Sequence, residues 1–113
     1  MKPFSITVER NGAEARVRLE GELDIATTPG AEAELKRLEQ DGAAAIVLDL
    51  RGLTFMDSTG LRLLVSADAR AREAGRRLTI IQGPEAVHRV LEITGLDTKL
   101  NVVAASGEAT TPD

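Results

Sequence analysis

Cysteine is absent from this chain of 113 residues, and only Phe4 and Phe55 are aromatic. The lack of cysteine excludes disulfides and thiolate metal sites. The scarcity of aromatic rings leaves no platform on which nucleic-acid bases could stack. A formal net charge of -4 also disfavours binding through nucleic-acid phosphates. We therefore expect no nucleic acid among the partners of this protein.

Long apolar runs are missing as well. No stretch approaches the roughly 18 apolar residues of a membrane-spanning helix. The first residues, Met1 to Phe4, contain no apolar segment of signal-peptide length. These observations predict a cytoplasmic protein with no membrane partner. The remaining composition, 42% hydrophobic and 28% charged, is typical of a globular domain.

The first third of the chain predicts a hairpin followed by a helix. Residues 5–10 and 13–20 alternate apolar and polar side chains, which is the period of half-buried strands. Asn11-Gly12 between them favours a tight turn, because both residues accept positive φ. Thr27-Thr28-Pro29 favours a helix start, with Pro29 at the first helical position and a threonine as the cap. Asp41-Gly42 is expected to end that helix.

The rest of the chain predicts strands that alternate with helices. The apolar run at 44–50 carries one acid and suits a strand covered on both faces. Residues 78–81 and 100–103 predict two shorter strands. Between these strands, apolar residues recur at helical spacing. Gly75 and Gly95 are expected to end the two helices.

This order of elements predicts an α/β fold: a single domain whose mixed β-sheet has an N-terminal antiparallel hairpin and helices packed against it. We expect the domain to span residues 1–103. Residues 104–113 are small, polar and acidic, and predict a disordered tail. Sites in such sheets lie at the carboxyl ends of the parallel strands. Asp24 follows the second strand and Asp57-Ser58 follows the third, so we expect them at the same edge.

Ser58 is expected at the start of the helix that follows the third strand. A hydroxyl there can cap free N–H groups, and a helix N-terminus also attracts anions. The residues alone leave three roles open: a cap, a nucleophile and a phosphorylation site. The nucleophile is disfavoured because Met56 stands where a serine-hydrolase motif has glycine. The single histidine, His88, is expected on the surface of a helix.

Other catalytic and cofactor sites are also disfavoured. The chain lacks the Gly-Lys pair of a phosphate-binding loop. Asp24, Asp49 and Asp57 are scattered and have no second histidine to support them, so we expect no metal site. These observations predict a protein that is not an enzyme and has no cofactor.

A phosphate on Ser58 would instead act on binding. It would add about -1.5 to -2 charges, which a helix N-terminus tolerates without a change of fold. A partner that docks beside Asp24 and Asp57 would then meet a larger negative patch. The pattern therefore allows an on/off switch for binding, and the alternative is that Ser58 only caps the helix.

Four segments resemble, in order and spacing, the bacterial anti-sigma factor antagonists of the STAS domain family. The resemblance extends from about Ser5 to Val103, and the segments are Gly21-Glu22-Leu23-Asp24, Val47-Leu48-Asp49-Leu50, Phe55-Met56-Asp57-Ser58-Thr59-Gly60-Leu61 and Val90-Leu91-Glu92-Ile93-Thr94-Gly95-Leu96.

This resemblance implies partner switching in sigma factor regulation. It implies that Ser58 is phosphorylated by the partner, an anti-sigma factor that is also an ATP-dependent serine kinase, and that a protein phosphatase reverses the change. ATP and Mg²⁺ would belong to that kinase. The unphosphorylated antagonist would bind the anti-sigma factor and release a sigma factor.

The resemblance also implies a partner-binding set of Asp24, Asp57, Ser58, Thr59 and Gly60. Thr59 stands where many members have serine, so it is a minor alternative phosphoacceptor. Asp24 matches an acidic position that members use to contact the kinase, and the alternative is a loop acid that caps the Thr27-Thr28-Pro29 region. The alternative function is a ligand-binding or scaffold module of a signalling complex that does not switch.

Overall fold

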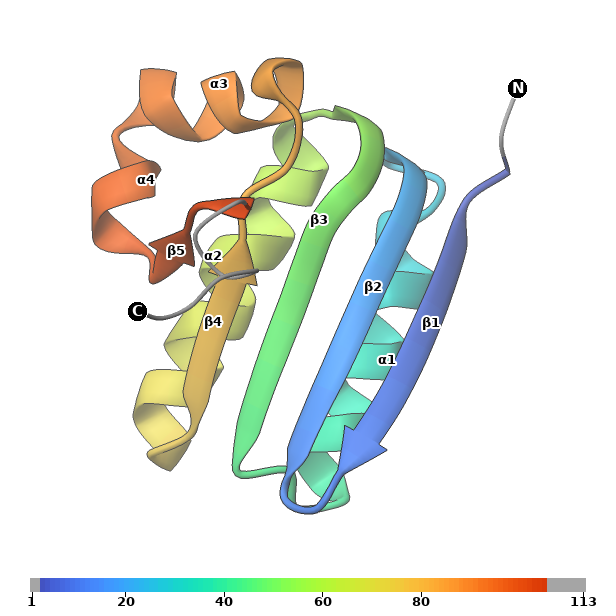
Figure 1. The fold of residues 1–113 in the computed structure, drawn as a ribbon, viewed down its shortest axis with the longest axis vertical. Coiled ribbons are helices and arrows are strands. Elements are labelled where there is room, and N and C mark those ends of the chain that lie inside the picture. The colour runs from blue at the N-terminus through green and yellow to red at the C-terminus, as the bar shows by residue number, and fades with distance from the viewer. Residues whose placement is uncertain (1–2, 106–113) are drawn as a thin grey trace.

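One mixed β-sheet organises the computed structural model, which describes residues 3–105 (Figure 1). Its strands lie in chain order, β1-β2-β3-β4-β5. The first pair is antiparallel and every later pair is parallel. The strands are β1 (Ser5–Asn11), β2 (Glu14–Leu23), β3 (Ala45–Met56), β4 (Arg77–Ile81) and β5 (Val102–Val103). The predicted α/β fold and its N-terminal hairpin are thereby confirmed.

The helices occupy two places around this sheet. They are α1 (Thr28–Gln40), α2 (Ser58–Ala74), α3 (Glu85–Thr94) and α4 (Leu96–Lys99). Figure 1 shows α1 and α2 behind the sheet, while α3 and α4 lie beyond the β4 side. The short α4 was not predicted from the sequence. Among residues 3–105, no helix combines the length and apolar character needed to cross a membrane.

The core lies between the sheet and the helices. The apolar positions of the predicted second strand, Ala15, Val17 and Leu19, are all buried, as the alternation requires. They meet buried residues of β3, α1 and α2, including Ile46, Leu48, Leu50, Leu35, Leu38, Leu63 and Leu64. Full burial of a leucine side chain contributes roughly 1.5–3 kcal/mol. This core fixes the positions of the strand ends that carry the candidate site.

The third strand differs from its prediction in two ways. It continues to Met56, because its second half pairs with β2 through register shifts next to Glu20 and Gly21. It is also not covered by helices on both faces. Asp49 is fully buried on β3, where it accepts hydrogen bonds from the Arg51 backbone N–H and guanidinium and lies 3.7 Å from Arg18 Nε.

The helix ends test several of the sequence predictions. Gly75 and Gly95 end α2 and α3 with φ of 71° and 78°, as predicted, because glycine has no Cβ to oppose a left-handed conformation. The predicted start of α1 is wrong in two details: Pro29 is the second residue of the helix and not the first, and no threonine side chain caps the helix. Thr27 precedes α1, but its hydroxyl donates to the Glu22 carbonyl and accepts from the Asp24 N–H instead. Most of the predicted tail, residues 106–113, lies outside the described residues.

Candidate functional site

The carboxyl ends of β2 and β3 meet at one edge of the sheet. Leu23 pairs with Met56, and the N–H of Asp57 donates a 3.2 Å hydrogen bond to the Leu23 carbonyl. The residues that follow each strand, Asp24 and Asp57, therefore emerge side by side. Their predicted arrangement at a shared edge is confirmed. This edge also carries the first turn of α2 and hence Ser58.

The cap of α2 is Asp57. Its extended backbone, with φ of -105° and ψ of -168°, directs Oδ1 at the N–H groups of Thr59 (2.9 Å) and Gly60 (3.3 Å). The Thr59 hydroxyl donates to the same oxygen over 2.5 Å. This hydroxyl bond lowers the pKa of Asp57, partial burial opposes the effect, and the backbone N–H bonds add to the lowering. The capping role considered for Ser58 is therefore taken by its neighbour.

Ser58 is the first residue of α2, and its side chain is exposed. Within residues 3–105 its hydroxyl makes no hydrogen bond, whereas the hydroxyl of Thr59 is held by Asp57. An exposed hydroxyl with no intramolecular partner is accessible to another protein. Ser58 and Thr59 are adjacent in the sequence, but Ser58 is exposed and unbonded, whereas Thr59 is half-buried and bonded to Asp57.

Gly60 has a packing role at this edge. The residue is buried, and a Cβ placed on it would lie 2.7 Å from Met56 Cγ and 3.0 Å from two Leu23 side-chain atoms. A side chain at this position would therefore push α2 away from the strand ends. Sequence reasoning placed Gly60 with the partner-binding residues, but the structure puts it beneath the surface that Asp24, Asp57, Ser58 and Thr59 form.

Asp24 shapes the loop between β2 and α1. Its Oδ1 accepts hydrogen bonds from the N–H of Ala26 (3.0 Å), the N–H of Thr27 (3.2 Å) and the Thr27 hydroxyl (3.2 Å). The carboxylate is half-buried. The turn-forming role that the sequence allowed is therefore present. The role in partner contact stays a prediction.

A groove that the sequence did not reveal runs beside Ser58, between the starts of α1 and α2. Its volume is about 260 Å³, and its walls are Ile25, Thr28, Pro29, Glu32, Thr59, Arg62, Leu63 and Ser66. Ile25 is 76% exposed, which is unusual for a large aliphatic residue. The groove and the acidic edge together form a continuous candidate binding site.

His88 does not lie on the surface as predicted. Only 13% of its side chain is exposed. Val87, the residue before it on α3, is fully buried in the core. This part of α3 therefore packs against the domain, and His88 is largely covered.

Residues 6–104 match the family described as Mlab, STAS domain. The chain belongs to the STAS domain family. The anti-sigma-B factor antagonist of Staphylococcus aureus is 36% identical over 86 residues, which is 76% of this chain and 80% of the relative. That relative and several of the solved structures that match this chain are named as antagonists of anti-sigma factors.

Solved structures carry the same fold. An anti-sigma factor antagonist from Mycobacterium paratuberculosis superimposes with a TM-score of 0.80 at 25% identity, covering 88% of this chain and 85% of the other. The Bacillus cell fate determinant SpoIIAA in its phosphorylated form gives a TM-score of 0.74 at 21% identity, with 93% and 95% coverage. The STAS fold therefore extends over nearly the whole chain.

Proposed function

We propose that this STAS domain is an anti-sigma factor antagonist that is switched off by phosphorylation at Ser58. In the unphosphorylated state it binds an anti-sigma factor with serine kinase activity and so releases a sigma factor. The observation that carries the proposal is the exposed Ser58 hydroxyl, which has no hydrogen bond within residues 3–105 and lies next to the capping carboxylate of Asp57. The name of the Staphylococcus aureus relative and the phosphorylated form of SpoIIAA support it.

The capping geometry explains how a phosphate would act. Asp57 already accepts the N–H groups of Thr59 and Gly60, so a phosphate on Ser58 cannot take these donors without displacing the cap. The phosphate therefore stays at the surface beside Asp57 and Asp24. The local charge changes from that of two carboxylates to about -3.5 to -4. The helix dipole still favours an anion at this end, so the domain itself is not destabilised.

The groove beside Ser58 supplies the contact area for the partner. Ile25, Pro29 and Leu63 offer apolar surface, while Glu32 and Arg62 add charges of both signs. An apolar side chain of the kinase can enter this groove while its phosphate-transferring site faces Ser58. A new phosphate at the rim would then add bulk and charge where the partner closes over Ser58, and a charge that is buried without a matching group costs several kcal/mol.

The reagents of the switch belong to other proteins. ATP and Mg²⁺ are bound by the partner kinase, and a protein phosphatase restores the free hydroxyl. The antagonist contributes the acceptor serine, the docking edge and a fold that does not change. No cofactor of its own takes part in this cycle.

The test is phosphorylation by the anti-sigma factor kinase of the native host. The purified chain is incubated with that kinase, ATP and Mg²⁺, and the phosphorylated residue is located by mass spectrometry. We expect phosphate on Ser58 and loss of the complex in a pull-down, with recovery after phosphatase treatment. A complex that survives stoichiometric phosphorylation would contradict the switch.

The groove also supports a second candidate, a STAS module that binds a ligand or scaffold partner without switching. In that case the groove variant Ile25→Ser would weaken binding, whereas Ser58→Asp would leave it unchanged. The switching antagonist requires both variants to weaken binding. The two functions are therefore separated by the Ser58→Asp variant alone.

A further inference from the structure

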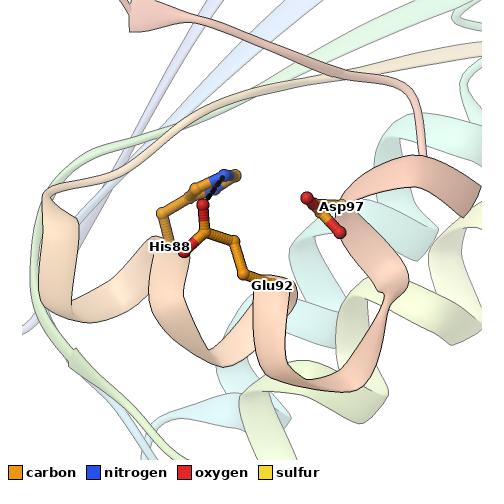
Figure 2. Close-up of side chains that lie close together, drawn as sticks. All are labelled: His88, Glu92 and Asp97. Carbon is orange, nitrogen blue, oxygen red and sulfur yellow. Dashed lines mark ion pairs between the residues drawn. The ribbon is translucent and has the colours of Figure 1, made fainter.

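His88, Glu92 and Asp97 converge in the angle between α3 and α4 (Figure 2). One donor atom from each, an imidazole nitrogen and two carboxylate oxygens, lies within 4.8 Å of the others. His88 and Glu92 are four residues apart on α3 and so share one face. Gly95, with φ of 78°, turns the chain so that α4 brings Asp97 to the same face. None of the three residues belongs to the site around Ser58.

The imidazole of His88 has no hydrogen bond within the described part of the chain. Nδ1 is buried without a partner. The nearest charged group, Glu92 Oε2, lies 3.9 Å from Nε2, which is too long for a hydrogen bond. The ring is 13% exposed, and Nε2 faces the two carboxylates.

Asp97 and Glu92 also lack a basic partner other than this histidine. Among residues 3–105, Asp97 forms no ion pair, and Glu92 forms only the long contact with His88. Two carboxylates at this separation repel each other unless a cation lies between them. The cluster therefore combines two carboxylates with an imidazole nitrogen that forms no hydrogen bond within residues 3–105.

We propose that His88, Glu92 and Asp97 bind a first-row divalent transition metal ion, with Zn²⁺ as the best-suited ion. One imidazole and two carboxylates form a mixed nitrogen and oxygen set that Zn²⁺, Co²⁺ and Mn²⁺ accept, whereas Ca²⁺ and Mg²⁺ prefer oxygen alone. Water completes the coordination, because three protein ligands leave a fourth position open.

The geometry requires only side-chain movement. Bonds of about 2.0–2.2 Å to zinc place neighbouring donors of a tetrahedral site about 3.3–3.5 Å apart. The separations here are at most 4.8 Å. The Glu92 side chain is 58% exposed and can rotate toward the ion, so α3 and α4 need not shift. Bound metal would then connect two helices that are otherwise joined by a single glycine.

The affinity should be weaker than that of a structural zinc site. A metal-bound histidine usually donates its other ring N–H to an acceptor, which fixes the ring and raises its basicity. Nδ1 of His88 has no such acceptor in the structure. The ring is oriented by packing alone.

The experiment uses the untagged full-length chain, because a polyhistidine tag would itself bind zinc. His88 is the only histidine in the sequence, so its imidazole signals in NMR spectra report on this site alone. We expect these signals to change saturably up to one equivalent of Zn²⁺. Co²⁺ should give a visible absorption band of matching stoichiometry.

Variants decide whether the three residues act together. We expect His88→Gln, Glu92→Gln and Asp97→Asn each to weaken Zn²⁺ binding by about tenfold or more. Glu73→Gln, which removes an exposed carboxylate of α2 from outside the cluster, is the matched control and should bind like the unmodified chain. Zn²⁺ should raise the melting temperature of the control but not that of Asp97→Asn.

Two results would overturn the site. One is an imidazole spectrum that does not change as Zn²⁺ is raised to millimolar concentration. The other is equal Zn²⁺ affinity in Asp97→Asn and Glu73→Gln. Because His88 is mostly buried, the His88→Gln variant could unfold. The Asp97→Asn variant changes a more accessible side chain, so the test depends on that variant. Phosphorylation of Ser58 is measured separately, so either proposal can fail without the other.

Discussion

The hydroxyl of Thr59 donates a 2.5 Å hydrogen bond to Oδ1 of Asp57, and the backbone N–H of Thr59 donates to the same oxygen. Asp57 and Thr59 flank Ser58 in the sequence, and the Asp57 carboxylate accepts the first free N–H groups of α2. A hydroxyl that donates to Asp57 is fixed in direction and must turn away from that carboxylate to reach the catalytic base of a kinase. Ser58 has no such bond within residues 3–105, so the geometry favours it as the phosphoacceptor.

Ser58 variants should separate binding from switching. We expect Ser58→Ala to bind the anti-sigma factor as tightly as the unmodified chain and to resist phosphorylation. Ser58→Asp should bind about tenfold or more weakly, because a charged and larger side chain is placed at the docking surface. Calorimetry on the purified pair measures both affinities, and circular dichroism checks that the folds agree. Equal affinities for the unmodified chain and Ser58→Asp would exclude a charge switch.

Thr59 should support the cap without accepting phosphate. Thr59→Val removes the hydroxyl bond to Asp57, so we expect a melting temperature a few degrees lower and an unchanged rate of phosphorylation at Ser58. Thr59→Ser retains the hydroxyl and is the control. Mass spectrometry after treatment with the kinase gives the modified residue. Phosphate found mainly on position 59 would refute the assignment.

Asp24 has a structural role that can be separated from partner contact. Asp24→Asn keeps an oxygen that can accept the N–H groups of Ala26 and Thr27, so stability should hardly change. If the charge contacts the kinase, the same variant should bind several-fold more weakly. Asp24→Ala should also lose about 1 kcal/mol of stability. Melting curves and phosphorylation rates are needed for both variants. Normal binding by Asp24→Asn would leave only the turn role.

Gly60 should be intolerant of a larger residue. Gly60→Ala places a methyl group 2.7 Å from Met56 Cγ, so we expect a loss of about 1–3 kcal/mol from overpacking. Gly30→Ala in α1 is the matched control, because nothing lies within 4 Å of its Cβ position. That change should stabilise the helix by up to about 1 kcal/mol. Urea unfolding measures both. A neutral Gly60→Ala would show that α2 can move away from the strand ends.

Asp49 should make stability depend on pH in the acid range. Its burial would raise the pKa of the carboxyl, but hydrogen bonds from Arg51 and the charges of Arg51 and Arg18 outweigh burial and lower it. The resulting stabilisation is complete above the ordinary aspartate pKa of about 3.9. It is lost as the pH falls through the lower folded-state pKa.

Asp49→Asn should therefore reduce stability at neutral pH by about 1–3 kcal/mol, because Arg51 loses a buried charged acceptor and Arg18 loses an ion pair. The variant should also lose less stability than the unmodified chain when the pH falls below about 4. Urea unfolding at several pH values measures the difference. Asp41→Asn, at an exposed loop position, is the control. A parallel pH dependence in Asp49→Asn and the unmodified chain would contradict this role.

Local pattern was enough to predict much of the fold. The alternation of residues 5–10 and 13–20 predicted the hairpin, because strand period and turn preference are properties of neighbouring residues. Gly75 and Gly95 also predicted the helix ends from local preference alone. Each adopts a positive φ, which is unfavourable for residues that carry a Cβ. The segments around Asp24 and Ser58 were also sufficient to indicate the STAS family.

Contacts between distant segments decided the rest. Asp57, and not Ser58, caps α2 because β3 extends to Met56 and the Leu23 carbonyl fixes the backbone of Asp57 in an extended form. Both residue types are good caps, so their local preferences could not choose between them. Gly60 is required only because two strand ends converge beneath it. The groove beside Ile25 and the burial of His88 likewise depend on how α1, α2 and α3 pack, which no local pattern encodes.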